Sequence, residues 1–236
     1  MLYIVMPAYN EEAIIAETIE QWHQVVKKTG RSSRLVVFND GSKDNTYEIM
    51  LRLKDHYPQF IPIDKPNTGH GPTCTFAYNY CINAGAEYIF QTDSDGQTSP
   101  TDFWQLWEQR NTYDFLIGYR KNRQDGLARI LVSRVLKFLV WLIFGEKVKD
   151  PNTPFKLMNT DKLVSIVEVI PNDFFLSNVV ISMLIVKRKE KALWLPISFK
   201  ARKAGANSIK LIGITKIGFK AIGDLYRIRK KIRSSQ

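Results

Sequence analysis

Two carboxylates and one amide lie two residues apart directly after a short apolar segment. Asp93, Asp95 and Gln97 follow residues 88–91, so their side chains can approach one small site. Mg²⁺ and Mn²⁺ prefer carboxylate and amide oxygens, and they commonly complete their shell with substrate phosphates and water. A single Asp-x-Asp sequence is also typical of a solvated turn. A metal-bound phosphate substrate is therefore a hypothesis that the rest of the chain must support.

Apolar segments alternate with amphipathic segments over the first half of the chain. We expect strands at residues 2–6, 35–38, 60–63, 88–91 and 113–119. Helices are expected from residue 11, over 44–56 and 72–85, and from residue 100. Asn10 is the expected cap of the first helix, and Ser99 with Pro100 begins the fourth. This alternation predicts an α/β fold with a mostly parallel central sheet and helices on both faces.

Ligands of open α/β sheets collect at the carboxyl ends of the strands. Four of the expected strands end in glycine-rich or polar turns, at residues 7–11, 40–42, 69–71 and 93–95. Neither a G-x-G-x-x-G nor a P-loop sequence is present, so Rossmann dinucleotide binding and P-loop chemistry are poorly supported. Together the four turns favour a functional site over a solvated turn at residues 93–97.

The net charge of +11 is unevenly distributed. Residues 1–119 contain nine Lys or Arg and fifteen Asp or Glu, whereas residues 200–236 contain eleven basic residues and one acidic residue. Such a basic segment suits nucleic acid, anionic lipid or a phosphorylated substrate. In the expected helix 127–144, Arg129 and Ser133 share a face and could bind one phosphate, with Arg120 entering from the preceding loop.

No stretch reaches the length of a membrane span, and the N-terminus does not resemble a signal peptide. Cys74 and Cys81 are expected to be core residues in a reducing compartment. The apolar part of helix 127–144 could face the core, a partner subunit or lipid. The basic, amphipathic segment 208–236 is expected to lie on an anionic membrane surface, with a solvated basic face as the alternative. We therefore expect a cytoplasmic protein, peripheral on the cytosolic face of a membrane.

Several ordered motifs resemble one family. The sequences PAYNEE (7–12), NDGS (39–42), NTGHG (67–71) and DSDGQ (93–97) are similar to those of family 2 glycosyltransferases, which have the GT-A fold. Those at 118–124, 150–156 and 196–208 resemble polyprenyl-phosphate glycosyltransferases of the dolichyl-phosphate mannosyltransferase type. The resemblance covers essentially the whole chain. It implies inverting transfer of a hexose from a nucleotide diphosphate sugar (GDP-mannose or UDP-hexose) to dolichyl or undecaprenyl phosphate.

The resemblance also implies residue roles. The implied donor-binding residues are Pro7, Tyr9, Asn10, Glu11, Asp40, Gly69, Asp93, Ser94 and Asp95. The implied ligands of Mg²⁺ or Mn²⁺ are Asp93, Asp95 and Gln97. The acceptor phosphate would be held by Arg120, Arg123, Arg129, Ser133, Arg202 and Lys203. Catalysis would depend on Asp93, Asp95, Arg120 and Arg129.

These roles divide the chain into three parts: a nucleotide-sugar half (1–119), an acceptor half of the same domain (120–207) and a membrane-facing segment (208–236). Two alternatives remain. A family 2 enzyme could use a polysaccharide or a lipid without phosphate, although the group of Arg120, Arg129 and Ser133 argues against that acceptor. A non-enzymatic basic module could bind membrane or nucleic acid, but no nucleic-acid partner is expected, because basic residues do not alternate with stacking aromatics. A homo-oligomer or a membrane partner subunit is left open.

Overall fold

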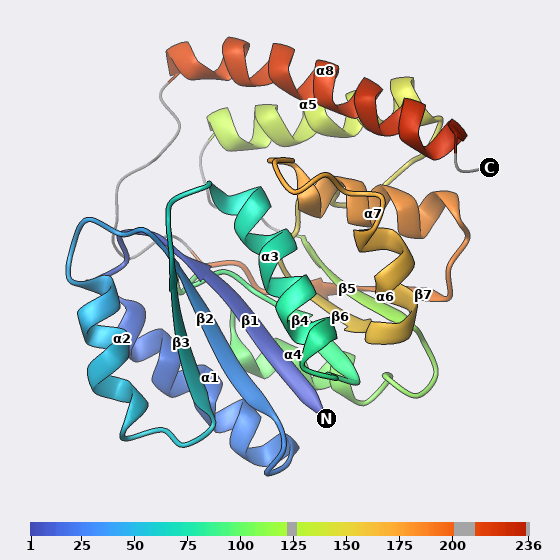
Figure 1. The fold of residues 1–236 in the computed structure, drawn as a ribbon. Coiled ribbons are helices and arrows are strands. Elements are labelled where there is room, and N and C mark those ends of the chain that lie inside the picture. Colours follow the sequence, from blue (N-terminus) through green and yellow to red (C-terminus); the bar gives the residue numbers. More distant parts are fainter. Residues whose placement is uncertain (122–126, 201–210, 235–236) are drawn as a thin grey trace.

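A computed structural model shows a central sheet between two layers of helices (Figure 1). It describes residues 1–121, 127–200 and 211–234, with side chains over 1–121, 132–200 and 221–232. Over these residues the strands are β1 (Leu2–Ala8), β2 (Arg34–Asp40), β3 (Phe60–Lys65), β4 (Tyr88–Gln91), β5 (Phe115–Arg120), β6 (Lys156–Asn159) and β7 (Ala192–Ile197). The helices are α1 (Ile15–Thr29), α2 (Thr46–Lys54), α3 (His70–Asn83), α4 (Pro100–Trp107), α5 (Leu127–Phe144), α6 (Thr160–Val167), α7 (Ser177–Lys187) and α8 (Leu211–Ser234).

The strand order is β3-β2-β1-β4-β6-β5-β7. All pairs are parallel except those of β6, which runs antiparallel to both β4 and β5. The predicted α/β class and mostly parallel sheet are therefore confirmed. The sequence prediction missed β6, because it is only four residues long and begins with a lysine. The sheet is continuous across residues 119–120, where the sequence suggested a boundary between two halves of one domain.

Side chains of each strand alternate between two cores, as the period of two requires. In β1, Tyr3 and Val5 belong to the core shared with α3, α5, α6, α7 and α8, whereas Leu2, Ile4 and Met6 pack with α1, α2 and α4. This alternation covers both faces of the sheet, as a parallel sheet requires, and leaves the carboxyl ends of its strands for a site.

Some predicted boundaries are correct and others are not. The strand at 88–91 and the helix at 127–144 occupy the predicted residues. The first helix begins at Ile15 rather than at residue 11, because Asn10 adopts a left-handed φ of 54° and its side chain accepts a hydrogen bond from the amide of Lys43. Ser99 precedes α4 as predicted, but its hydroxyl bonds that of Thr101 instead of a backbone amide.

The long helix α8 lies beside α5 (Figure 1). Its apolar residues Leu225 and Ile228 are fully buried in the core, together with Ala221 and Ile232. We predicted that the apolar side of this tail faces lipid, and for these residues the structure corrects that prediction: they face protein. In the part of the chain that the structure describes, no helix has the length and apolar character needed to cross a membrane.

Close packing at the start of α3 predicts a steric effect on stability. A Cβ atom on Gly71 would overlap the carbonyl group of Phe175, which is backbone and cannot swing away. We expect Gly71→Ala to lower the free energy of unfolding by at least about 1–3 kcal/mol, which is the usual cost of adding atoms to a well-packed core. Urea unfolding followed by circular dichroism measures this change.

The matched control is Gly223→Ala in α8, where a Cβ atom has no neighbour within 4 Å. This change should be neutral or stabilise the protein by up to about 1 kcal/mol, because alanine favours helix. Equal effects of the two substitutions would show that α3 does not pack against Phe175 as described.

Candidate active site

Hydrogen bonds join the loops that follow β1 and β2. The amide of Asn10 donates to Ser42 Oγ at 3.0 Å, and the amide of Glu11 donates to Thr46 Oγ1 at 2.8 Å. Ser94 Oγ donates to the carbonyl of Pro7 at 2.8 Å, which ties the loop after β4 to the end of β1. Hydrogen bonds therefore connect the loops after β1, β2 and β4 at one edge of the sheet. The predicted donor-binding residues Pro7, Asn10 and Ser94 lie in these loops.

Asp40 holds the third loop. Its two carboxylate oxygens accept hydrogen bonds from the amides of Thr68 and Gly69, each at 2.9 Å, and Lys65 pairs with the same buried carboxylate. Burial alone would raise the pKa of Asp40, but the hydrogen bonds from Lys65 and Thr68 outweigh burial and lower it. Asp40 is thus an ionised anchor for the residues that lead into α3. A direct contact of Asp40 with a nucleoside stays a prediction.

Asp93 lies at the end of β4 and pairs with His70 at the start of α3. The Asp93 Oδ1 and His70 Nε2 atoms are 3.0 Å apart, and Cys74 Sγ lies 3.8 Å from His70 Nδ1. Cys74 and Asp93 raise the pKa of His70 against the effect of burial. Burial would raise the pKa of Asp93, but the charge and hydrogen bond of His70 lower it. Each group of the pair therefore favours the charged form of the other.

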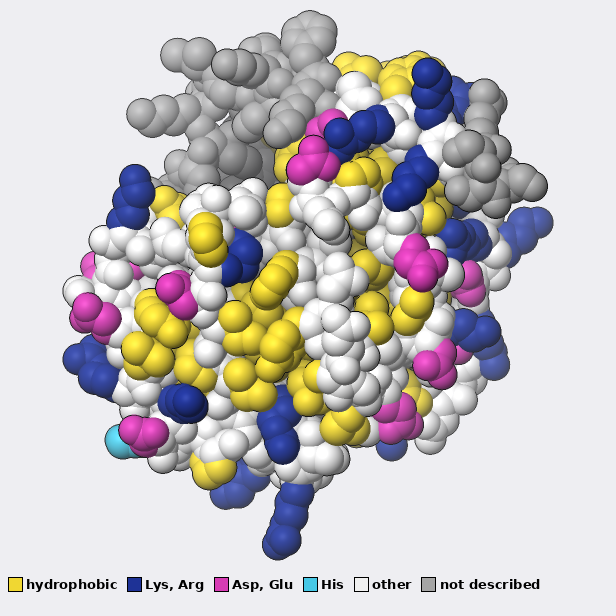
Figure 2. Space-filling view, viewed as in Figure 1, with side chains coloured by type: hydrophobic (Ala, Val, Ile, Leu, Met, Phe, Trp, Pro, Cys, Tyr) yellow, Lys and Arg dark blue, Asp and Glu magenta, His cyan; other side chains and the backbone are white. Residues whose placement is uncertain are grey.

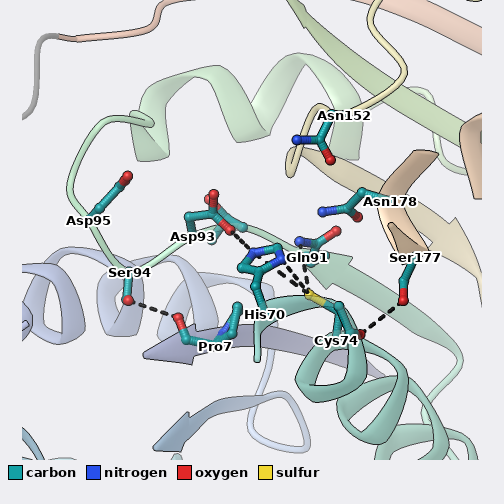
Figure 3. A network of polar contacts seen from close by, with 12 residues as sticks. Pro7, His70, Cys74, Gln91, Asp93, Ser94, Asp95, Asn152, Ser177 and Asn178 are labelled. Atoms are coloured by element: carbon teal, nitrogen blue, oxygen red, sulfur yellow. Dashed lines mark hydrogen bonds and ion pairs between the residues drawn. The ribbon is translucent and has the colours of Figure 1, made fainter. Parts of the chain in front are cut away.

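Different contacts hold the three predicted metal ligands, Asp93, Asp95 and Gln97. Asp95 stands apart from the Asp93–His70 pair (Figure 3), and its Oδ1 accepts a hydrogen bond from the amide of Gln97. Gln97 is buried, and its side-chain nitrogen donates to the carbonyl of Lys200 at 2.8 Å. Among the described residues no three His, Cys, Asp or Glu side chains form a metal-binding group. The two partly exposed carboxylates of this loop still fit an ion that takes its other ligands from a diphosphate and water.

A buried lysine from β6 lies close to these groups. Lys156 is fully buried, and its amine donates to Asn178 Oδ1 at 3.2 Å and to the carbonyl of Thr153. Burial lowers the pKa of Lys156 to about 7, although the negative charge of Asp150 opposes that shift. Lys156 is also one of the charges that lower the pKa of Asp93. The polar contacts continue from Asn178 through Tyr78 to Gln91.

Arg120, a predicted acceptor-phosphate residue, forms a buried pair with Asp150. Its Nε and Nη2 atoms each donate to one carboxylate oxygen at 2.8 Å, and Nη2 also approaches the carbonyl of Asn152. Such two-point pairing fixes the guanidinium and the loop after Asp150 together. Ser133 is buried on α5. Arg123, Arg202 and Lys203 lie outside the described residues, as does the side chain of Arg129 on α5.

Sequence reasoning missed Lys156, Asn178 and Asp150 as members of this site. The signal for Asp150 and Lys156 was the sequence DPNTPFK itself, whose final lysine is the first residue of β6. The signal for Asn178 was an amide near the start of an otherwise apolar helix. His70 lies in the motif at 67–71, but the sequence does not indicate its partner, Asp93.

A family model described as "Glycosyl transferase family 2" matches residues 3–165. The chain is 26% identical over 244 residues to a dolichyl-phosphate beta-glucosyltransferase of Trichomonas vaginalis, covering 95% of this chain and 71% of that protein. A second such protein of the same organism is 31% identical over 68% of this chain and 53% of its own length. An undecaprenyl-phosphate 4-deoxy-4-formamido-L-arabinose transferase of Salmonella newport is 24% identical over 62% of this chain and 45% of its length.

Solved structures of glucosyl-3-phosphoglycerate synthase from Mycobacterium tuberculosis have a similar fold. One in complex with phosphoglyceric acid has a TM-score of 0.71 and 17% identity, covering 98% of this chain and 80% of that chain. Another, in complex with Mn²⁺, UDP-glucose and phosphoglyceric acid, has a TM-score of 0.70 at 15% identity, with the same coverage. At these identities the likeness establishes the fold alone, which is the predicted GT-A fold.

The burial of Lys156 predicts a pH-dependent effect on stability. Between pH 7 and 10 the unfolded chain binds a proton at this amine that the folded chain largely lacks, so stability due to this group rises with pH. Below pH 7 both states bind the proton and the full cost of burial is present. The variant Lys156→Met lacks this amine, so only wild type gains this stability as the pH rises. The free energy of unfolding of the variant minus that of wild type should therefore decrease by roughly 2–4 kcal/mol from pH 6 to pH 10.

Urea unfolding at several pH values measures that difference. Lys162→Met, on the exposed face of α6, is the matched control and should differ from wild type by a constant amount. A pH-independent difference for Lys156→Met would mean that the amine is not buried in the folded protein.

Proposed function

The chain belongs to glycosyl transferase family 2, and we propose that it transfers a hexose, with inversion, from a nucleotide diphosphate sugar to a polyprenyl phosphate. The observation that carries this proposal is the match over 95% of the chain to a dolichyl-phosphate beta-glucosyltransferase. The chain spans about half the length of two other relatives named for dolichyl or undecaprenyl phosphate. Their names support a polyprenyl phosphate as the acceptor.

For the donor we propose UDP-glucose first and GDP-mannose second. Two relatives are named as glucosyltransferases, and one structural neighbour was solved with UDP-glucose and Mn²⁺. Asp93 and Asp95 would hold a Mg²⁺ or Mn²⁺ ion, which supplies charge neutralisation on the departing diphosphate. The connected loops at Pro7, Asn10 and Ser94 would position the nucleotide.

The acceptor needs no protein base. A phosphate monoester is already mostly anionic near neutral pH, so its oxygen can attack the sugar carbon directly. What the protein must supply is position and positive charge. We propose that Arg120, fixed by Asp150, contributes charge, and that Arg129 and Ser133 on α5 bind the phosphate.

We propose that α5 provides the docking surface on the cytosolic face of an anionic membrane. Phe138 and Leu142 on this helix are 55% and 57% exposed, and Val135 and Trp141 are also exposed. The neighbouring Arg134 and Lys137 are exposed as well and would attract anionic headgroups. Figure 2 shows hydrophobic and basic side chains side by side along its upper rim, where α5 and α8 lie in Figure 1.

The donor site predicts the effect of removing one carboxylate. We expect Asp95→Ala to abolish transfer and Mn²⁺-dependent binding of UDP-glucose, because the ion would lose one of its two proposed carboxylate ligands. Titration calorimetry with and without Mn²⁺ measures binding, and the melting temperature without ligand should stay within about 2 °C of wild type. Asp93→Ala should also be severe, but it disrupts the pair with His70 as well.

The control is Asp55→Ala at the end of α2, which is exposed and distant in sequence from the loop. It should bind UDP-glucose as wild type does. Near-normal turnover by Asp95→Ala, or full wild-type activity in excess chelator, would exclude the proposed metal site.

The α5 surface predicts a change in membrane binding. The double variant Phe138→Ser/Leu142→Ser should bind vesicles of anionic phospholipid at least tenfold more weakly, because two inserted apolar side chains are lost. Its binding of the water-soluble donor should be unchanged. Co-sedimentation with vesicles measures the first quantity.

The matched control carries the same two substitutions elsewhere: Phe76→Ser/Leu51→Ser, at residues that are each 44% exposed on α3 and α2. This control should bind vesicles as wild type does. If the two double variants bound equally well, α5 would not be the docking surface.

A further inference from the structure

The orientation of one buried amide is set by a lysine. Asn178, near the start of α7, is only 3% exposed. Its Oδ1 accepts a hydrogen bond from Lys156 Nζ at 3.2 Å and lies 3.5 Å from the hydroxyl of Tyr78. Because the lysine amine is the donor in this contact, the amide oxygen must face it. The amide nitrogen is therefore turned to the opposite side.

That nitrogen faces the candidate donor site. Figure 3 shows the Asn178 nitrogen on the side toward Asp93, with Asn152 and Gln91 on either side of it. Tyr78 donates to Gln91 Oε1 at 2.8 Å, which places the amides of Gln91 and Asn178 around one hydroxyl. Within the described part of the chain, Asn178 Nδ2 donates to no acceptor. This nitrogen is not among the fully buried polar atoms that lack a partner, so it is accessible and can donate to a bound group without first breaking a hydrogen bond within the protein.

The neighbouring carboxylate indicates which ligand group fits there. Asp93 presents carboxylate oxygens, which accept hydrogen bonds, on the side that the Asn178 nitrogen faces (Figure 3). A hydroxyl can donate to the carboxylate and accept from the amide at the same time. On the basis of the proposed function, we propose that Asn178 hydrogen-bonds a hydroxyl of the donor sugar and that Lys156 is the positioning residue that orients its amide.

The test compares donors that each lack one hydroxyl. Wild type and Asn178→Ala are assayed with UDP-glucose and its 2-, 3-, 4- and 6-deoxy forms, or with the corresponding GDP-mannose series if wild type turns over that donor instead. Asn178→Ala should lower kcat/KM for the parent sugar 10- to 100-fold, as loss of a hydroxyl-reading contact does. For the one deoxy form that lacks the contacted hydroxyl, the variant and wild type should have equal kcat/KM, because neither can make the contact. Inhibition by the free nucleoside diphosphate should not change.

Two further variants separate reading of the sugar from folding. Asn178→Asp keeps the shape and can pair with Lys156 but lacks the N–H donor, so it should lose the same hydroxyl preference. Lys156→Met should also lose the preference for that same hydroxyl. The double variant Lys156→Met/Asn178→Ala should lose less in kcat/KM than the product of the two single-variant losses, because both changes act on one contact. The control is Ser182→Ala, buried one turn later on α7 with its hydroxyl bonded to the carbonyl of Asn178. It should keep the wild-type preference.

If Asn178→Ala and Asn178→Asp are folded and keep the wild-type preference for every hydroxyl, this inference is wrong while the proposed function stands. If wild type turns over neither UDP-glucose nor GDP-mannose, the proposed function itself is wrong, and the inference falls with it. Equal losses across all deoxy forms would also overturn the inference, because they would indicate a general structural effect.

Discussion

The insertion of β6 between β4 and β5 is the constraint on which the candidate site depends. β6 runs antiparallel to both neighbours, so its first residue, Lys156, lies beside the carboxyl end of β4, opposite Gln91. A parallel strand in the same place would put its last residue there instead. The same reversal brings Asp150, in the loop that enters β6, to Arg120 at the end of β5. One short strand thus joins the candidate donor side of the sheet to the candidate acceptor side.

Three charged pairs then fix the loops around this junction. Asp40 with Lys65, Asp93 with His70, and Arg120 with Asp150 each join residues that are at least 23 positions apart in the sequence. Two of these pairs, Asp40–Lys65 and Arg120–Asp150, are largely buried, whereas His70 and Asp93 are partly exposed. Removing one partner of a buried pair is strongly destabilising, because the remaining charge keeps its cost of burial. The pairs therefore position the loops, which suits a reaction that depends on placing two phosphate-bearing substrates.

The sequence was sufficient for the fold class and the family, because those depend on local patterns. Residues 88–91 form a short apolar segment and residues 127–144 a long, predominantly apolar one, and these local features predict their elements correctly. Asn10 was misjudged as a helix cap, since its left-handed conformation depends on contacts with the following loop. The contact of Tyr78 with Asn178 spans 100 residues, and no spacing in the chain indicates it. The apolar side of α8 looked suitable for lipid because the sequence alone does not show that Leu225 packs inside the protein.

The central claim is transfer to a polyprenyl phosphate with inversion at the sugar carbon. Its most direct test is to incubate the protein with undecaprenyl phosphate and an α-linked donor, UDP-glucose or GDP-mannose, and to determine the anomeric configuration of the lipid product by NMR. The prediction is a hexose joined to the lipid phosphate by a β-linkage. An α-linked product would contradict inversion, and sugar transferred only to acceptors without phosphate would contradict the proposed acceptor.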